Sequence, residues 1–395
     1  MTKLAVVTPR YHESVVGGAE LHARWLSQRL AGAGHDVHIF TTGAVDALTW
    51  RNDLPMGESQ EDGLTVRRYP ADRPLPEVRG QLDQRMREGE HLGLGLEERW
   101  LRAGPNSRAL EQDLSRRGSG YGAVMALPYL AGSTYFAFAA CPDRFFLIPC
   151  LHDEPFARAE FTRRLFGGAR AVLFNSEPER LLAERLLPGQ LAPSAVIGLG
   201  FDAPGTVDPG GFLRKYGVKA PFAVYMGRLE QDKNVPLLIK NFLRYKVQRP
   251  GRLQLLLVGS GDAEPPPSPH IRRLSIDWAD RDSMLAAATF LFQPSIKESL
   301  SIVMMQAWAS GLPVVAHAEG DVSRWHCERS NGGLWFANYP EFELIVDRIT
   351  AEPELRGRLG EAGRRYVAEQ YGWDRVLDRF EAVLEAQAGR EVPDA

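Results

Sequence analysis

Short apolar runs alternate with helix-like segments throughout the first half of the chain. Residues 4–9 (LAVVTP) form a continuous apolar run that is typical of a buried strand. Apolar side chains then recur at helical intervals over 17–34, and residues 36–42 (DVHIFTT) form the next predicted strand. Further strands are predicted at 63–70, 122–130, 144–153 and 169–176, with a helix at 155–166. Strand and helix in repetition indicate a parallel sheet that is covered by helices.

The alternation restarts after residues 198–212, a stretch rich in Gly and Pro that is typical of a linker. Strands are predicted at 221–230, 253–262, 273–280, 290–295 and 312–317, and helices at 234–248, 283–290 and 299–311. We therefore expect an α/β fold of two doubly wound, Rossmann-like domains, at 1–204 and 205–375. Ligands of such folds bind at the carboxyl ends of the strands, so the two domains are expected to face each other across a ligand-binding cleft.

Two segments depart from this alternation. Residues 75–118 are polar and mixed in charge. We interpret them as a helical insertion in the first domain, either a lid or acceptor-side element or a plain solvated excursion. From residue 340 onward apolar residues recur at helical intervals, and the last helix, about 376–395, is expected to pack back on the first domain.

Composition narrows the class of protein. The chain has 395 residues, which is too long for one ordinary core and supports two domains. A net charge of -3 and a pI near 6.3 give no global basic field, so nucleic acid is not an expected partner. The three cysteines, Cys141, Cys150 and Cys327, form no CxxC pair. They predict a reduced protein without a disulfide framework or structural zinc.

The sequence shows no targeting or membrane-spanning segment. Its start lacks the apolar core and cleavage site of a signal peptide, and no apolar run approaches the roughly 20 residues that a membrane helix requires. We therefore expect a cytoplasmic protein without a transmembrane segment. Peripheral membrane contact stays open, although no strongly basic amphipathic helix indicates it.

Glu298 and Gln306 are the polar residues that interrupt the apolar stretch KESLSIVMMQAW. On one helix, eight residues separate them by about 12 Å along the axis and about 80° around it, so they could line one elongated ligand. The alternative is structural, because Ser295 and Glu298 match a capping box and Gln306 could lie on the rim of a core helix.

The segment GRLEQDK, residues 227–233, carries Arg228 after a predicted strand and Lys233 before a predicted helix. A guanidinium fork, an ammonium group and the free N–H groups of a helix start together suit a diphosphate. Only seven of the 47 basic residues are lysine, so a lysine here favours that interpretation slightly. The alternative is a surface loop whose cations pair with Glu230 and Asp232.

Three further candidates are weaker when each is taken alone. Gly17 and Gly18 precede a helix, where glycines let the backbone approach a ligand, but they do not fit GxGxxG. His152, in CLHDEP, ends a predicted strand and is either a ligand contact or a structural histidine. Asp280 and Asp282 form a DxD triplet, which we interpret as helix caps rather than as a metal site. No metal is therefore expected.

In chain order, the segments GGAE, LHD, GRLEQDK, VGSGD and PSIKESLSIVMMQAWASGLPVVA resemble the family 4 retaining glycosyltransferases of GT-B fold. The resemblance covers nearly the whole chain apart from 75–118. It implies that Glu298 contacts the donor sugar. The family carries a second acid for the nucleotide ribose, and this chain has Gln306 there instead. Ser301 is a second departure, since the family usually has Gly at that position.

The resemblance also implies roles for the other candidates. Arg228 and Lys233 would hold the leaving diphosphate, together with the N–H groups of Ser299, Leu300 and Ser301. Gly17 and Gly18 would close over the phosphates from the first domain. His152 would contact the donor sugar, and Ile276 and Trp278 lie near the base by position only. The catalytic set is Glu298, His152, Arg228 and Lys233.

The activity that this implies is transfer of a hexose from a UDP- or GDP-linked donor to an unidentified acceptor, with retention of anomeric configuration. The acceptor could be a sugar, a lipid or a small molecule, and the reaction is expected to need no metal and no cofactor. Two alternatives stay open: a nucleotide-sugar-binding protein of the same fold without turnover, and a nucleotide-sugar epimerase.

Overall fold

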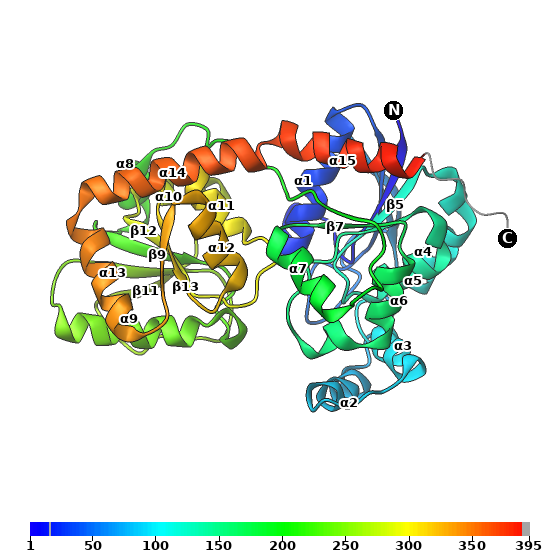
Figure 1. Cartoon of the computed structure of the whole chain (residues 1–395), viewed down its shortest axis with the longest axis horizontal. Coiled ribbons are helices and arrows are strands. Elements are labelled where there is room, and N and C mark those ends of the chain that lie inside the picture. The colour runs from blue at the N-terminus through cyan, green and yellow to red at the C-terminus, as the bar shows by residue number, and fades with distance from the viewer. Residues whose placement is uncertain (16, 389–395) are drawn as a thin grey trace. The chain divides into compact units, whose positions relative to one another are not determined.

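The computed structural model describes residues 1–15 and 17–388. The chain forms two compact units (Figure 1). Among the described residues, unit 1 contains those from Met1 to Gly200 and 376–388, and unit 2 contains Phe201–Arg375. Each unit has its own sheet and its own hydrophobic core, so each is described separately.

Unit 1 is built on an eight-stranded sheet with the order β3-β4-β2-β1-β5-β6-β7-β8. Every neighbouring pair is parallel except β3 and β4, which form an antiparallel hairpin. The strands are β1 (Lys3–Val7), β2 (Asp36–Thr42), β3 (Gly57–Glu61), β4 (Leu64–Tyr69), β5 (Ala123–Ala126), β6 (Phe145–Leu147), β7 (Ala171–Phe174) and β8 (Ser194–Val196).

Helices connect these parallel strands (Figure 1). The α-helices are α1 (Gly18–Gly32), α2 (Pro76–Arg87), α3 (Leu94–Arg102), α4 (Arg108–Arg117), α5 (Gly132–Ala140), α6 (Glu160–Gly168) and α7 (Glu177–Leu186). Short 3₁₀ turns cover Gly118–Gly120, Pro142–Arg144 and Pro155–Arg158. α15 (Trp373–Ala388) begins in unit 2 and enters unit 1 at Val376. There Val376 and Phe380 are fully buried, and Arg379 donates to the carbonyl of Ile197 at 3.4 Å.

Unit 2 is built on a six-stranded sheet, entirely parallel, with the order β11-β10-β9-β12-β13-β14. Its strands are β9 (Phe222–Met226), β10 (Gln254–Val258), β11 (Ile271–Leu274), β12 (Phe290–Gln293), β13 (Val314–His317) and β14 (Gly333–Phe336). The order reverses direction at β9, which is the doubly wound arrangement. The two Rossmann-like sheets predicted from the sequence are therefore confirmed.

The helices of unit 2 follow its strands in the expected alternation. They are α8 (Pro209–Tyr216), α9 (Val235–Gln248), α10 (Arg281–Ala287), α11 (Ile302–Ala309), α12 (Asp321–Ser330), α13 (Tyr339–Ala351) and α14 (Pro353–Tyr371), with 3₁₀ turns at Gln231–Lys233 and Trp278–Asp280. None of the helices in the described part of the chain has the length and apolar character that crossing a membrane would demand.

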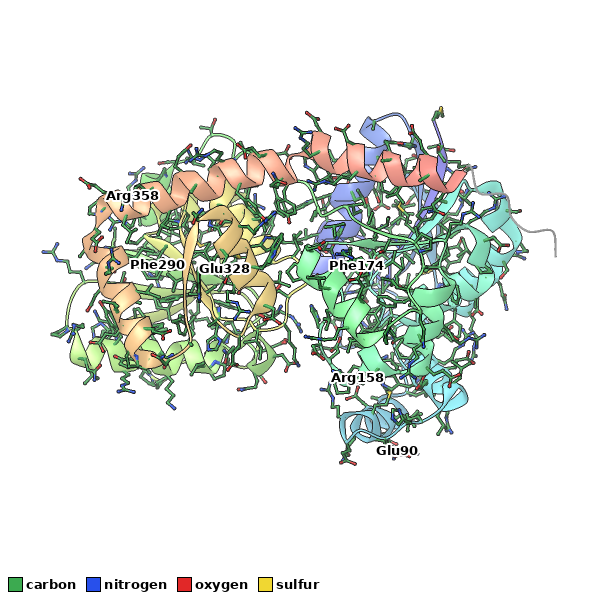
Figure 2. All side chains as sticks on the ribbon, viewed as in Figure 1. Glu90, Arg158, Phe174, Phe290, Glu328 and Arg358 are labelled. Carbon is green, nitrogen blue, oxygen red and sulfur yellow. The ribbon has the colours of Figure 1, made fainter. Side chains whose placement is uncertain are left out.

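Continuous apolar strands explain both cores. β5, β7, β9, β12 and β13 are buried at every position, as parallel strands with helices on both faces must be. Phe174 of unit 1 and Phe290 of unit 2, both labelled in Figure 2, are 0% exposed. Burial of each such side chain stabilises the folded state by about 1.5–3 kcal/mol. The packed strands therefore hold in place the polar loops that follow their ends.

The insertion at 75–118 consists of α2, α3 and α4, and α3 is part of the core of unit 1. Trp100 is stacked on Phe156 at 4.9 Å between ring centroids. The buried Glu97 carboxylate accepts the N–H groups of Glu160 at 3.1 Å and Phe161 at 2.8 Å, so it caps the start of α6. α3 is therefore packed into unit 1, so the insertion is not merely a segment that extends into solvent.

Predicted boundaries near the candidate site residues of unit 2 differ from the structure at two elements. The strand predicted at 273–280 is β11 (Ile271–Leu274), and a 3₁₀ turn at Trp278–Asp280 follows it. The helix predicted at 299–311 begins only at Ile302, because Ser301 has φ +67° and turns the chain into α11. Apolar side chains continue through both turns, so hydrophobic pattern alone could not locate these boundaries.

Candidate functional site

In unit 2, the loops after β9 and β10 lie backbone against backbone. The N–H of Leu229 donates to the carbonyl of Ser260 at 2.7 Å. A Cβ atom at Gly259 would come within 1.9 Å of the Gly227 carbonyl oxygen, and one at Gly261 within 2.3 Å of the Leu229 carbonyl oxygen. The two glycines of VGSGD are therefore needed for the close approach of the GRLEQDK loop.

Lys233 and Glu298, which are 65 positions apart, form an ion pair in this loop region. Lys233 Nζ lies 2.6 Å from Glu298 Oε1, and the side chains are 21% and 15% exposed. Lys233 also donates to the carbonyl of Lys297 at 3.4 Å. The structure thus brings together the ammonium group and the carboxylate that the sequence singled out separately, at the carboxyl ends of β9 and β12.

Arg228 has a more exposed setting. Its side chain is 63% exposed and its guanidinium lies 2.7 Å from the Glu230 carboxylate, the pairing expected for a surface loop. Its backbone is fixed, because the buried Tyr225 hydroxyl donates to the Arg228 carbonyl at 2.7 Å. Burial first, and then the charge of Glu298, raises the pKa of Tyr225 well above its ordinary value, so this hydroxyl keeps its proton.

The capping-box interpretation of Ser295 and Glu298 is wrong. α11 begins at Ile302, so Glu298 precedes the helix and its relation to Gln306 is not that of two residues on one helix. The Ser295 hydroxyl instead donates to the Lys297 carbonyl at 3.3 Å. The residue before the helix is Ser301, whose φ of +67° lies in the left-handed region that favours glycine. Ser299 is half-buried and Leu300 is buried between them.

Gln306 lies in α11 and is 6% exposed. Within the described residues, neither its Nε2 nor its Oε1 has a hydrogen-bond partner. A buried amide without partners costs free energy, because it has lost its bonds to water without replacing them. Gln306 therefore has one donor group and one acceptor group that remain to be satisfied.

The residues assigned to the base and the DxD triplet lie around the turn before α10. Trp278 is 42% exposed, with the Arg281 guanidinium 4.7 Å from its ring centroid, and Ile276 is half-buried. The carboxylate of Asp280 lies 2.6 Å from Lys215 Nζ, and that of Asp282 lies 2.7 Å from the Arg281 side chain. Both acids of the triplet are thus paired with cations, and the described residues contain no group of three or more metal-ligating His, Cys, Asp or Glu side chains.

In unit 1, Gly17 and Gly18 lie at the start of α1, where Gly17 is the N-cap. A Cβ atom at Gly17 would lie 2.1 Å from a carboxylate oxygen of Glu20, whereas one at Gly18 would meet no atom within 4 Å. Glu20 itself is paired with Arg10. A side chain at Gly18 would therefore meet no close neighbour, whereas one at Gly17 would displace Glu20.

His152 follows β6 in a loop whose acids are engaged by other side chains. The ring is 30% exposed, and Nδ1 lies 4.0 Å from Glu154 Oε1. The Tyr129 hydroxyl donates to Glu154 at 2.8 Å. Asp153 is paired with Arg158 at 2.7 Å and with Arg185 at 3.1 Å. The imidazole thus lies at the carboxyl end of β6, in a loop whose acids contact neighbouring side chains.

Sequence reasoning did not find Glu179, a buried acid beneath this loop. Its side chain accepts the N–H groups of Leu151 and Asn175, each at 2.6 Å. Burial is the main cause that raises the pKa of Glu179 to about 8, and those hydrogen bonds oppose it. The signal was present, because Ser176 and Glu179 match a capping box at the start of α7.

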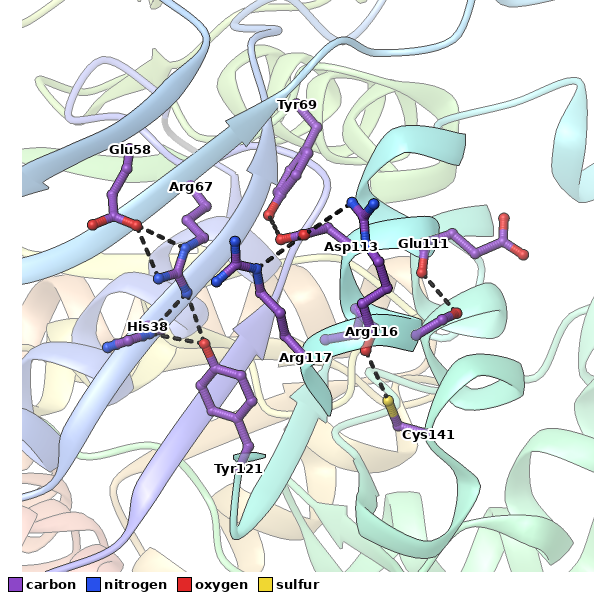
Figure 3. Close-up of polar contacts among 12 residues, drawn as sticks. His38, Glu58, Arg67, Tyr69, Glu111, Asp113, Arg116, Arg117, Tyr121 and Cys141 are labelled. Carbon is purple, nitrogen blue, oxygen red and sulfur yellow. Dashed lines mark hydrogen bonds and ion pairs between the residues drawn. The ribbon is translucent and has the colours of Figure 1, made fainter. Parts of the chain in front are cut away.

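A second polar cluster in unit 1 pairs its own charges (Figure 3). Arg67 contacts Glu58, His38 and the Tyr121 hydroxyl, and Asp113 contacts Tyr69, Arg116 and Arg117, at distances of 2.7–3.2 Å. These contacts join β2, β4 and α4. Their mutual pairing indicates a structural role.

Comparison with known proteins places these features in context. The family described as "Glycosyl transferases group 1" matches residues 214–366. The D-inositol 3-phosphate glycosyltransferase of Kribbella flavida is 26% identical over 401 residues, which cover 91% of this chain and 88% of that protein. The GDP-mannose-dependent monoacylated alpha-(1-6)-phosphatidylinositol monomannoside mannosyltransferase of Corynebacterium glutamicum is 26% identical over 186 residues, or 42% of this chain and 48% of that protein.

Solved structures show the same fold at low sequence identity. The sucrose-phosphate synthase of Thermosynechococcus elongatus has a TM-score of 0.73 and 17% identity, covering 99% of this chain and 100% of that one. Anabaena HepE, solved in complex with UDP-glucose, has a TM-score of 0.69 and 18% identity over 99% of this chain and 100% of that one. At these identities the likeness establishes the architecture of the chain.

Proposed function

Because this chain is a family 4 retaining glycosyltransferase of GT-B fold, which moves a sugar from a nucleotide sugar, we propose that its donor is a UDP- or GDP-linked hexose. The observation that carries the proposal is the Lys233–Glu298 ion pair of 2.6 Å beside the start of α11. One similar structure holds UDP-glucose, and one relative is named as GDP-mannose-dependent, which supports both donor classes.

The diphosphate is held by Lys233, Arg228 and the N–H groups of Ser299, Leu300 and Ser301. Lys233 supplies a compact charge that is mostly shielded from solvent, and Arg228 supplies a bidentate fork. Glu298, which is paired with Lys233 by one oxygen, contacts the donor sugar. When the diphosphate binds, Lys233 exchanges part of its bond to Glu298 for the phosphate.

The remaining donor contacts are assigned to both units. The buried amide of Gln306 hydrogen-bonds the ribose hydroxyls, a role that suits its unpartnered donor and acceptor. Trp278 and Ile276 lie near the base. In unit 1, Gly17 and Gly18 approach the phosphates with the N–H groups at the start of α1, and His152 contacts the donor sugar.

The proposed reaction breaks the bond between the anomeric carbon and the phosphate oxygen. The electron pair of that bond leaves with the nucleoside diphosphate, and an oxocarbenium-like centre develops on the sugar. Lys233, Arg228 and the N–H groups of 299–301 stabilise the growing negative charge. The acceptor hydroxyl attacks from the same face, and its proton passes to the departing phosphate, so the configuration is retained.

We propose that transfer requires no divalent metal, since both carboxylates of the DxD triplet are paired with cations. Activity should persist in chelator, and restoration of a lost activity by magnesium or manganese would contradict this. The cytoplasmic location expected from the sequence is also part of this proposal. The acceptor, whether sugar, lipid or small molecule, is not assigned.

The test begins with a thermal-shift screen against UDP, GDP, ADP and their sugars, followed by NMR of the sugar product. We expect stabilisation by UDP or GDP compounds, and a product of retained configuration. Glu298→Ala and Lys233→Ala should abolish most turnover, whereas Lys297→Ala, which changes the neighbouring side chain, should not. Wild-type turnover in both site variants would contradict the assignment, and stabilisation by ADP compounds alone would contradict the donor class.

A further inference from the structure

We propose that Glu179 is a positioning residue that holds His152 in place through the backbone of Leu151. The inference rests on the proposed function, in which His152 contacts the donor sugar. It assigns a role to a buried acid that touches neither the sugar nor the nucleotide. All of the contacts that support it lie within unit 1.

The Glu179 carboxyl group ties two strand ends together. Glu179 is in the first turn of α7 and is 1% exposed. Its Oε1 accepts the N–H of Leu151 at 2.6 Å, and its Oε2 accepts the N–H of Asn175 at 2.6 Å. Leu151 follows β6 and directly precedes His152, whereas Asn175 follows β7. One side chain thus sets the register of both loops at the point where His152 leaves the sheet.

The loop needs such a restraint because its backbone is strained at the preceding residue. Cys150 has φ +52°, a left-handed conformation that residues other than glycine rarely adopt. Such a conformation persists only where the surrounding contacts impose it. The Asn175 amide approaches Cys150 Sγ at 3.7 Å, and the bond from Leu151 to Glu179 holds the next peptide. Loss of that bond should let residues 150–152 relax and move the imidazole.

A helix cap alone does not account for Glu179. The Ser176 hydroxyl accepts the N–H of Glu179 at 3.3 Å, which caps α7. The bond from Leu151 comes from a segment 28 positions away and adds nothing to that cap. The two roles can therefore be separated, because Ser176→Ala removes a cap bond and leaves the contact with Leu151 unchanged.

The experiment is a double-mutant cycle in the full-length protein. Glu179→Gln keeps the size of the side chain, but its NH₂ group cannot accept an N–H, so one of the two bonds is lost. Glu179→Gln, His152→Ala and the double variant are assayed for turnover of the donor identified in the thermal-shift screen. UDP or GDP affinity and the unfolding temperature are measured in parallel, with Ser176→Ala as the matched control.

Glu179→Gln should lower kcat by about tenfold to a hundredfold, the range expected from misplacing a catalytic contact, with nucleoside diphosphate affinity nearly unchanged. In the His152→Ala background the same substitution should have almost no further effect on kcat. Ser176→Ala should lower the unfolding temperature and keep kcat. If Glu179→Gln does not fold, Glu179→Asp, which withdraws the carboxyl group by one methylene, takes its place in the cycle.

If the losses of kcat in Glu179→Gln and His152→Ala multiply in the double variant, Glu179 acts independently of His152. That result would overturn the inference. Full activity in His152→Ala would overturn it as well. Failure of the proposed function looks different, because the unmodified protein would then turn over no UDP- or GDP-linked hexose.

Discussion

The loop after β9 in unit 2 and the loop after β6 in unit 1 both present polar groups at the carboxyl end of a strand, but they are held differently. In the first, Lys233 and Glu298 pair directly with each other at 2.6 Å. In the second, His152 Nδ1 lies 4.0 Å from Glu154 Oε1, and the backbone of the preceding residue, Leu151, is held by the buried Glu179 at 2.6 Å.

The difference shows two ways to preorganise a site. Direct pairing leaves both charges partly exposed and ready to exchange one partner for a ligand. A buried restraint on the backbone fixes a side chain without touching it. Substitutions in unit 2 should therefore act on binding and on transition-state charge together, whereas Glu179 should act on turnover and leave nucleotide affinity nearly unchanged.

The largest effect is expected from Glu298→Ala. It removes the proposed contact with the donor sugar and frees Lys233 from its pair, so kcat/KM should fall by about 10²–10³-fold. The kcat/KM of Glu298→Gln, which keeps the shape of the side chain and loses its charge, should fall less. Steady-state kinetics with the preferred donor measure this, and equal activity of Glu298→Ala and the unmodified protein would remove Glu298 from the site.

The second effect concerns pH and the buried acid of unit 1. Burial raises the pKa of Glu179 from 4.5 in the unfolded chain to about 8 in the folded one. Between these values the folded state binds more protons, so this group's contribution to the free energy of unfolding falls as pH rises, by at most about 1.4 kcal/mol per pH unit. The contribution is fully present below pH 4.5 and is lost above about pH 8.

Urea denaturation of the unmodified protein and Glu179→Gln across this window isolates the contribution, because the other titrating groups are common to both. These include the buried His22, whose pKa is lowered to about 4 by burial. Its contribution to the free energy of unfolding rises with pH in the acidic range, opposite to that of Glu179. A difference between the two proteins that does not change with pH would show that Glu179 titrates normally.

A third and smaller effect is expected from Arg228→Ala. The side chain is 63% exposed and already paired with Glu230, so its contribution to diphosphate binding is screened by solvent. We expect about a tenfold loss of kcat/KM, or about 1.4 kcal/mol. Arg228→Lys should recover only part, because it lacks the bidentate fork. A loss of kcat/KM as large as that of Lys233→Ala would show that Arg228 contributes strongly to diphosphate binding despite its exposure to solvent.

The smallest effect is a change of stability at Ser301. Ser301→Gly and Ser301→Ala both lose the hydroxyl that accepts from Gln293, but only glycine relieves the backbone conformation at φ +67°. Ser301→Gly should therefore be more stable than Ser301→Ala by about 1 kcal/mol in chemical denaturation. The reverse order would show that the backbone here is not strained.

Much of the fold was predictable from the sequence. The apolar run at 36–42 coincides with β2, and the predicted helix at 234–248 differs from α9 by one residue. β3 was missed, since GESQE is a polar edge strand with no apolar period. The start of α11 was misplaced because Ser301 turns the chain in a conformation that no hydrophobic pattern reveals.

Some residues of the candidate site were likewise predicted from the sequence, and others were missed. Lys233 and Glu298 were found because each carries a charge beside a glycine-rich or apolar motif, and the structure then showed that they form a pair. Ser176 and Glu179 match a capping box, which would have placed Glu179 at a helix start. Its contact with Leu151 spans 28 positions and goes to a backbone N–H, so that contact has no signature in the sequence. Charged residues in recognisable motifs are visible in the sequence, whereas a long-range contact from a buried acid to a backbone N–H is not.

The most direct test of the central claim is to compare the affinities of UDP with UMP and of GDP with GMP by calorimetry, in the unmodified protein, Lys233→Ala and Lys297→Ala. If Lys233 holds the diphosphate, the preferred diphosphate should bind more tightly than its monophosphate. That preference should fall by about tenfold or more in Lys233→Ala, and Lys297→Ala should keep it. An unchanged preference in Lys233→Ala would contradict the account.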